Sequence, residues 1–395
     1  MTSVDQEQAF VPGLELSRGY FADVVEPIVA KIEPGLRYSA GLIGTGSDVV
    51  GFDTARSMYH DWGPRLVIWL AEDDFAAIGA TLPCEIGTRL PPSYRGFATR
   101  FLTNDDGTVK TASEDAMRHL VAASSVRRWF GGGDRADPAT ASWIRLPDEV
   151  IDAALAGEAI EIDPATWVTL PAQWLLESTV GGVFRDDLGA ISALRETLAW
   201  YPDDVWRYLM AAQWRRLDQM EPFVGRCAEV GDDLGSQLVA FSQIRDVMRL
   251  AFLQERQYAP YAKWFGSGFA RLEAAAVLGP LLDAARYTTD GREREANLVR
   301  AVQWLGDRQN AMGVAEPVET SVRMFYSRPF EVLSAVRFGE ALMAAITDPR
   351  VRQLPWNLGG IDQITDSTDV VGNGSLQQVI GAWLNAGNGK HHRTD

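Results

Sequence analysis

A chain of 395 residues, 46% of them hydrophobic, is long enough for two domains with substantial cores and too apolar to be disordered. Its formal net charge of −16 opposes a nucleic acid polymer as partner, because such binding depends on basic residues that neutralise phosphates. Cys84 and Cys227 show no zinc-like spacing, and no apolar run approaches the roughly twenty residues that span a membrane. We expect a soluble cytoplasmic protein with reduced thiols and no membrane contact.

The first predicted elements surround a glycine-rich turn. Apolar residues recur at near-helical spacing from Leu14 to Ile32, and the short apolar stretch Tyr38–Ile43 predicts a buried strand that ends at glycine. Gly44-Thr45-Gly46-Ser47 then predicts a tight polar turn. Because glycine adds no Cβ, backbone N–H groups of this turn can approach an anion such as phosphate, and the residues after it can open a helix.

A second strand is predicted shortly after this turn. The apolar run Leu66–Leu70 follows the segment Tyr59-His60-Asp61-Trp62. Side chains alternate along a strand, so His60 and Asp61 point to opposite faces; we give His60 a structural role and expect Asp61 to face the turn. Arg65 could meet phosphate or form a salt bridge in the strand layer, and both interpretations stay open.

A Gly-Ser pair followed by an acidic strand entrance resembles the nucleotidyltransferase superfamily with the polymerase-beta-like fold. The longer string GSDVVGFDTARSMYHDWGPRL is similar to an uncharacterised bacterial domain-of-unknown-function family within it, as are WYPDDVWRYLMAAQW and ERQYAPYAKWFG. The resemblance implies an α+β fold, with a mixed-sheet nucleotidyltransferase-like domain followed by a helical bundle. It also implies ATP or another NTP with Mg²⁺, and transfer of a nucleoside monophosphate, most simply AMP, to a small-molecule or protein hydroxyl.

The resemblance also assigns the site. It implies that Gly46 and Ser47 bind the triphosphate and that Asp61 is a metal ligand or base, while Asp48 and Asp53 lie near enough in sequence to join a metal site. Tyr59 stands where the family has its first Asp, and phenol is a poor magnesium ligand beside a carboxylate. The alternative is therefore a catalytically degenerate member that binds a nucleotide or a protein partner without turnover.

Later segments give the domain organisation. Glu72–Gly79 predicts a helix that opens with acids, and Arg95–Phe101 is the best candidate for a later strand, although it contains no acid. We expect the first domain at 1–130, an irregular connection at 131–166, a helical bundle at 167–374, and a short helix with a disordered tail at 375–395.

The second half is predicted to be a succession of helices. Apolar residues recur at threes and fours after Pro202, and the longest helix is expected over 236–257, with Arg245, Arg249 and Arg256 on or beside a face other than its apolar stripe. Further helices are expected at 264–285, 291–310 and 330–346. Arg328-Pro329-Phe330 is interpreted as a helix start.

The segment Glu255–Trp264 combines charges, aromatic rings and a proline at a helix break. Its rings could stack on a base while Lys263 offers charge to phosphate, or the segment could be an interhelix corner whose aromatics fill core. Glu221 or Asp232 could serve as general base for the acceptor. The oligomeric state stays open.

Overall fold

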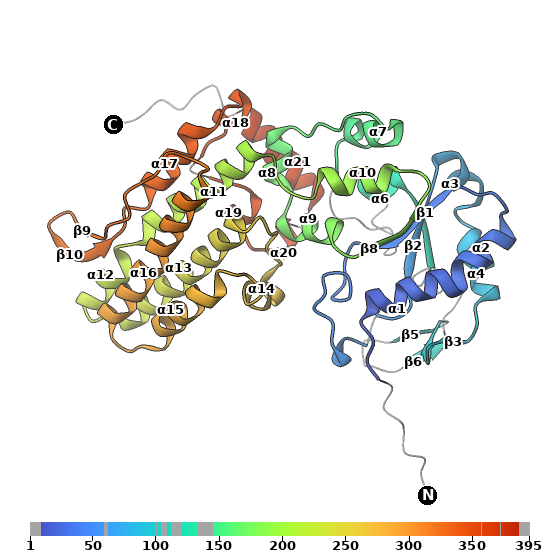
Figure 1. The fold of residues 1–395 in the computed structure, drawn as a ribbon, viewed down its shortest axis with the longest axis horizontal. Coiled ribbons are helices and arrows are strands. Elements are labelled where there is room, and N and C mark those ends of the chain that lie inside the picture. Colours follow the sequence, from blue (N-terminus) through green and yellow to red (C-terminus); the bar gives the residue numbers. More distant parts are fainter. Residues whose placement is uncertain are drawn as a thin grey trace, which may run out of the picture. The chain divides into compact units, whose positions relative to one another are not determined.

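The computed structural model describes residues 9–58, 62–99, 101–103, 109–111, 121–132, 145–356, 358–371 and 373–386. Two compact units share the chain. The first comprises residues 1–162 and 174–199, and the second comprises residues 163–173 and 200–395. One small mixed sheet with many helices agrees with the predicted α+β class (Figure 1).

The first unit contains the larger sheet. Its helices are α1 (Gly13–Tyr20), the π-helical turn η1 (Phe21–Val25), α2 (Glu26–Ile32), the 3₁₀ turn η2 (Ala55–Ser57), α3 (Glu72–Ile78), α4 (Leu82–Arg89), α6 (Val126–Phe130), α7 (Asp148–Ala156), most of α9 (Ala172–Thr179) and α10 (Ala190–Thr197). Its strands are β1 (Tyr38–Leu42), β2 (Leu66–Leu70), β3 (Ser93–Tyr94), β4 (Phe97–Ala98), β5 (Phe101–Thr103), β6 (Val109–Thr111), β7 (Val121–Ser125) and β8 (Gly182–Asp186).

The sheet has the order β7–β2–β1–β8, with β1 antiparallel to both of its neighbours and β2 parallel to β7. Every residue of β1 and β2 is buried. On one face Ala40 and Ile68 join a core that includes Val29 of α2 and Ile86 of α4. Burial on both faces explains why β2 is a continuous apolar run and why β1 is mostly apolar, without alternation.

The predicted strand Arg95–Phe101 is not a single strand: β4 covers Phe97–Ala98 and β5 begins at Phe101. β3 and β4 form a small hairpin, and β5 pairs with β6. Arg95 and Gly96 have φ of 48° and 83°, which turns the chain where the sequence suggested a straight run.

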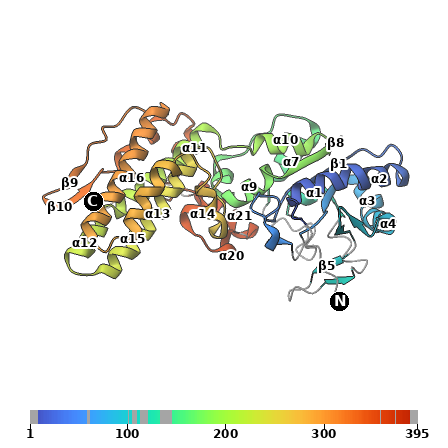
Figure 2. The same ribbon diagram turned by 60° about the horizontal axis from the view of Figure 1, so that its bottom comes forward.

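The second unit is mainly helical. Its elements are α8 (Pro164–Thr169), α11 (Asp203–Met220), α12 (Phe223–Glu229), α13 (Asp233–Gln254), α14 (Ala262–Phe269), α15 (Ala275–Tyr287), α16 (Gly291–Met312), β9 (Arg323–Phe325), β10 (Arg328–Val332), α17 (Val336–Ala345), α18 (Pro349–Arg352), α19 (Ile361–Ile364), α20 (Thr368–Val371) and α21 (Gly374–Ala386). Long helices α13 and α16 lie side by side with α12 and α15, as both views show (Figure 2). No helix in the described ranges is long and apolar enough to cross a membrane.

The predicted long helices α11, α13 and α16 are confirmed, because each carries an apolar stripe that the bundle buries. Three details differ. The stretch from residue 167 on, predicted to be helical, includes β8, which pairs with β1 in the first unit. Residues 328–332 form β10, paired with β9, so Arg328 does not begin a helix. The predicted helix 264–285 is two helices, since α14 ends at Phe269 and α15 begins at Ala275.

Candidate functional site

The Gly44–Ser47 turn lies directly after β1, as predicted. Gly44 and Gly46 have φ of 102° and 137°, values that side chains with a Cβ rarely adopt. No helix begins directly after the turn: the N–H groups of Val49 and Val50 both donate to the Gly46 carbonyl, Gly51 then reverses the chain with φ of 71°, and the next helical turn, η2, begins at Ala55. The turn is therefore a backbone loop, without a helix N-terminus behind it.

The turn presents hydrogen-bond donors in succession. Within the described part of the chain, the N–H groups of Thr45, Gly46, Ser47 and Asp48 and the hydroxyl of Ser47 have no hydrogen-bond partner. Thr45 is exposed, and Gly46 and Ser47 are half-buried. Consecutive unbonded N–H groups in a turn are available as donors to an anion.

A bidentate ion pair between Arg65 and Asp48 holds the turn in place. Arg65 Nε lies 3.2 Å from Asp48 Oδ2, and Arg65 Nη2 lies 2.9 Å from Asp48 Oδ1 and 2.9 Å from the Thr45 carbonyl oxygen. Asp48 is buried, with 3% of its side chain exposed. Of the two interpretations left open for Arg65, the structure shows the salt bridge.

Asp53 also has internal partners. Its Oδ2 accepts hydrogen bonds from Gly13 N at 2.7 Å and from Trp62 Nε1 at 3.1 Å, which ties the start of α1 to the loop before β2. Tyr59, His60 and Asp61 lie outside the described residues. Among the residues with described positions, no three His, Cys, Asp or Glu side chains gather as a metal site.

The sheet supplies no further carboxylate at the turn. β7, which occupies the place predicted for Arg95–Phe101, contains no acid. β8 ends in Asp186, which sequence analysis missed, but its carboxylate accepts hydrogen bonds from Ser39 Oγ and from the N–H groups of Gly189 and Ser192. Asp186 therefore caps the start of α10, and its partner Ser39 is near the beginning of β1, while the turn follows the end of β1.

The second unit contains a cavity of about 360 Å³. One face of α13 forms a wall, because residues 241, 244, 245, 248, 249, 252 and 253 recur at threes and fours and all line it. Eight aromatic side chains line it, namely Trp167, Trp200, Tyr201, Phe241, Phe252, Tyr258, Tyr261 and Phe265. The segment 257–262 also contributes, so the aromatic cluster predicted around Glu255–Trp264 belongs in part to a cavity.

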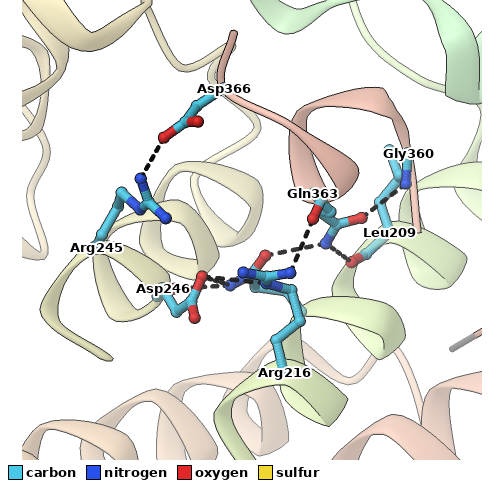
Figure 3. Close-up of polar contacts among 8 residues, drawn as sticks. Leu209, Arg216, Arg245, Asp246, Gly360, Gln363 and Asp366 are labelled. Carbon is cyan, nitrogen blue, oxygen red and sulfur yellow. Dashed lines mark hydrogen bonds and ion pairs between the residues drawn. The ribbon is translucent and has the colours of Figure 1, made fainter. Parts of the chain in front are cut away.

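Polar contacts hold α19, which lines part of this cavity, in place. Gln363 Oε1 accepts the N–H of Gly360 at 2.8 Å, and Gln363 Nε2 donates to the Leu209 carbonyl at 3.0 Å. Figure 3 shows Arg216 of α11 directed at both Gln363 and Asp246, with distances of 2.8 Å to the Gln363 carbonyl and 3.3 Å to Asp246 Oδ1. α19 is thereby tied to α11 and α13.

Arg245, Arg249 and Arg256 were expected on or beside a face of the helix predicted over 236–257 other than its apolar stripe. Arg245 and Arg249 line the cavity together with residues of that stripe. Arg245 pairs with Asp366 at 2.5 Å (Figure 3). Arg249, a half-buried residue, has no hydrogen bond or ion pair within the described residues, and burial lowers the pKa of its guanidinium. Lys263 does not line the cavity; it is exposed, with Nζ 4.8 Å from the ring centroid of Trp264.

The two carboxylates considered as general bases accept hydrogen bonds from backbone N–H groups. Asp232 accepts the N–H of Gly235 at 2.8 Å as the N-cap of α13. Glu221, at the end of α11, accepts the N–H groups of Leu333 at 3.0 Å and Ala335 at 3.2 Å. Burial raises the pKa of Glu221 to about 7.

Glu221 should make stability depend on pH. Its folded-state pKa of about 7 exceeds the ordinary value of 4.5, so the folded state binds more protons than the unfolded state between these values. The free energy of unfolding should therefore fall as pH rises from about 4.5 to 7, by on the order of 3 kcal/mol from this group. Urea unfolding at pH 5 and pH 8 should show a smaller decline in Glu221→Gln than in the wild type. The exposed Glu340→Gln is the control, and an equal decline in all three proteins would contradict the assignment.

Comparison with known proteins gives one partial match. Residues 167–265 match the family described as "Domain of unknown function (DUF4037)". The matched range includes the cavity-lining residues from Trp167 to Phe265. No curated protein and no solved structure matches the chain.

Proposed function

We propose that this protein binds a nucleoside triphosphate, ATP in the first instance, at the Gly44–Ser47 turn. We further propose that it transfers the nucleoside monophosphate to a hydroxyl group of a small molecule or protein, with Asp61 completing the site. The observation that carries the proposal is the row of N–H groups from Thr45 to Asp48, which, together with the Ser47 hydroxyl, have no partner among the described residues.

Phosphate suits this turn for two reasons. Its oxygens can accept several hydrogen bonds at once, and hydrogen bonds from backbone N–H groups to a charged acceptor are among the stronger ones. The Arg65 guanidinium beneath the turn offsets the Asp48 carboxylate, so the buried charges at the turn balance and do not repel an anion.

The described carboxylates do not fit a magnesium site. Both oxygens of Asp48 bond to Arg65, a cation that would repel Mg²⁺, and Asp53 Oδ2 already accepts two hydrogen bonds. Mg²⁺ therefore enters the proposal only as the ion that accompanies ATP in solution.

The same contacts support the alternative, a protein that binds a nucleotide or a protein partner without turnover. Asp48 and Asp53 are committed to structural partners, and Tyr59 stands at the position of the first family Asp. The transferase and the nucleotide-binding form of the alternative share the turn and differ in whether the nucleotide is consumed.

Ser47→Ala should weaken ATP binding by about ten-fold or more, because it removes a hydroxyl donor to a charged phosphate. Isothermal titration of the full chain with ATP and Mg²⁺ measures the affinity. Ser93→Ala, at an exposed position in β3, is the matched control and should bind like the wild type. Equal affinities of the wild type, Ser47→Ala and Ser93→Ala would mean that the turn is not the ATP site.

Turnover separates the two functions. Incubation of the wild type with α-labelled ATP, Mg²⁺ and a panel of hydroxyl compounds and proteins should yield labelled acceptor if the protein is a transferase. Label transfer by Tyr59→Asp but not by the wild type would establish the binding-only alternative. If neither protein binds ATP, the transferase function fails, and so does the nucleotide-binding form of the alternative.

A further inference from the structure

The cavity of the second unit combines apolar walls with a cation, Arg249, that has no hydrogen bond or ion pair among the described residues. Its volume of about 360 Å³ lies in the range of small-molecule sites, and it is enclosed by a single unit of the chain. Arg249 enters it from the same face of α13 as Ile244, Met248 and Phe252. A guanidinium has five N–H donors, and taking them out of water without an acceptor is costly.

Asp362 acts on Arg249 electrostatically but does not bond to it. It also lines the cavity, but its Oδ2 accepts the N–H of Ala172 at 2.7 Å, and it forms no ion pair with Arg249 within the described residues. The other cavity arginine, Arg245, already pairs with Asp366. Arg249 is therefore the cavity arginine whose N–H donors have no acceptor among the described residues.

We infer that this cavity binds a small carboxylic acid with a flat, apolar body, whose carboxylate pairs with Arg249 and whose body lies among the aromatic rings. A carboxylate matches the planar fork of a guanidinium, and the rings of Phe241, Phe252 and Trp200 offer surfaces on which a flat body can pack.

Other charge types fit less well. A cationic ligand would be repelled by Arg249, although aromatic rings alone would attract it. A phosphate dianion carries more charge than one guanidinium compensates, and Asp362 in the same cavity would repel it about twice as strongly as it repels a carboxylate. A monoanion is therefore the better match for Arg249.

Three ligands with one body test the inference: 2-naphthoate, its neutral amide 2-naphthamide and 2-naphthyl phosphate. Isothermal titration of the full chain should show that the acid binds at least about ten-fold more tightly than the amide, since only the acid forms a charged hydrogen-bonded pair. Equal affinity of acid and amide would overturn the role of Arg249. Tighter binding of the phosphate than of the acid would overturn the carboxylate assignment.

Variants of Arg249 test whether this residue causes the preference for the acid over the amide. Arg249→Met should lose the preference for acid over amide, Arg249→Lys should keep part of it, and Arg226→Met, at an exposed position on α12, should keep all of it. Retention of the full preference for the acid in Arg249→Met would contradict the inference. If that variant fails to fold, the comparison of acid with amide on the wild type still decides. ATP titrations on the same proteins are independent, because this inference does not rest on the turn in the first unit.

Discussion

Arg65→Met should lower the free energy of unfolding by about 3 kcal/mol, because it leaves the Asp48 carboxylate buried without its cation. Asp48 is 3% exposed and Arg65 is 17% exposed, so water can hardly replace the lost guanidinium at Asp48. The variant also removes the Nη2 hydrogen bond to the Thr45 carbonyl, so the Gly44–Ser47 turn loses its support. Urea unfolding measures the stability, and an ATP titration at a temperature where the variant is folded measures the consequence for the turn.

The double variant Asp48→Asn/Arg65→Met tests the cause. If the unpaired charge dominates, the double variant should be more stable than Arg65→Met, with a coupling energy of about 2 kcal/mol between the two positions. Additive losses would mean that Arg65 contributes by packing alone. Arg89→Met is the comparison, since Arg89 and Glu85 form an exposed pair at 3.6 Å and such pairs contribute little.

The sequence predicted elements whose signals are local. β1 and β2 are buried on both faces, and their mostly apolar sequences carry that information locally. β8 carries no such signal, since most of its side chains are only half-buried, and its partner β1 lies far away in the chain. In β10, Phe330 and Val332 are buried while Arg328 and Glu331 are exposed, but so short an alternation resembles a helix start after proline.

The cavity, like the pairing of β8 with β1, depends on contacts between segments that are far apart in the sequence. Sequence analysis identified aromatics around Glu255–Trp264 and named Lys263 as the cation, yet Lys263 is exposed and Arg249 lines the cavity. Arg249 becomes a cavity residue only because the 360–371 segment folds back onto α13, with Gln363 bonded to α11. A contact over such a distance in sequence leaves no local pattern. A signal was nevertheless present, since Arg245, Arg249 and Phe252 share one face of a helix at spacings of four and three.

Gly46→Ala should be the most damaging single-atom change at the turn. A Cβ at Gly46 would lie 2.3 Å from Asp48 Oδ1 and 2.4 Å from Arg65 Nη2, and φ of 137° adds backbone strain of about 1–3 kcal/mol. The Asp48–Arg65 pair must therefore move. We expect ATP affinity to fall by about a hundred-fold, as expected when two charged hydrogen bonds from the turn are lost.

Gly63→Ala provides the matched control for that change. Gly63 has a similar φ of 154°, but a Cβ there would meet nothing within 4 Å, so the variant carries the strain without the collision. Unfolding and ATP titrations should show a smaller loss of stability and wild-type affinity for Gly63→Ala. The collision acts through the ion pair, so Gly46→Ala should cost less in an Arg65→Met background than in the wild type. Equal costs in both backgrounds would mean that backbone strain alone makes glycine necessary at Gly46, and that the ion pair does not shape the turn.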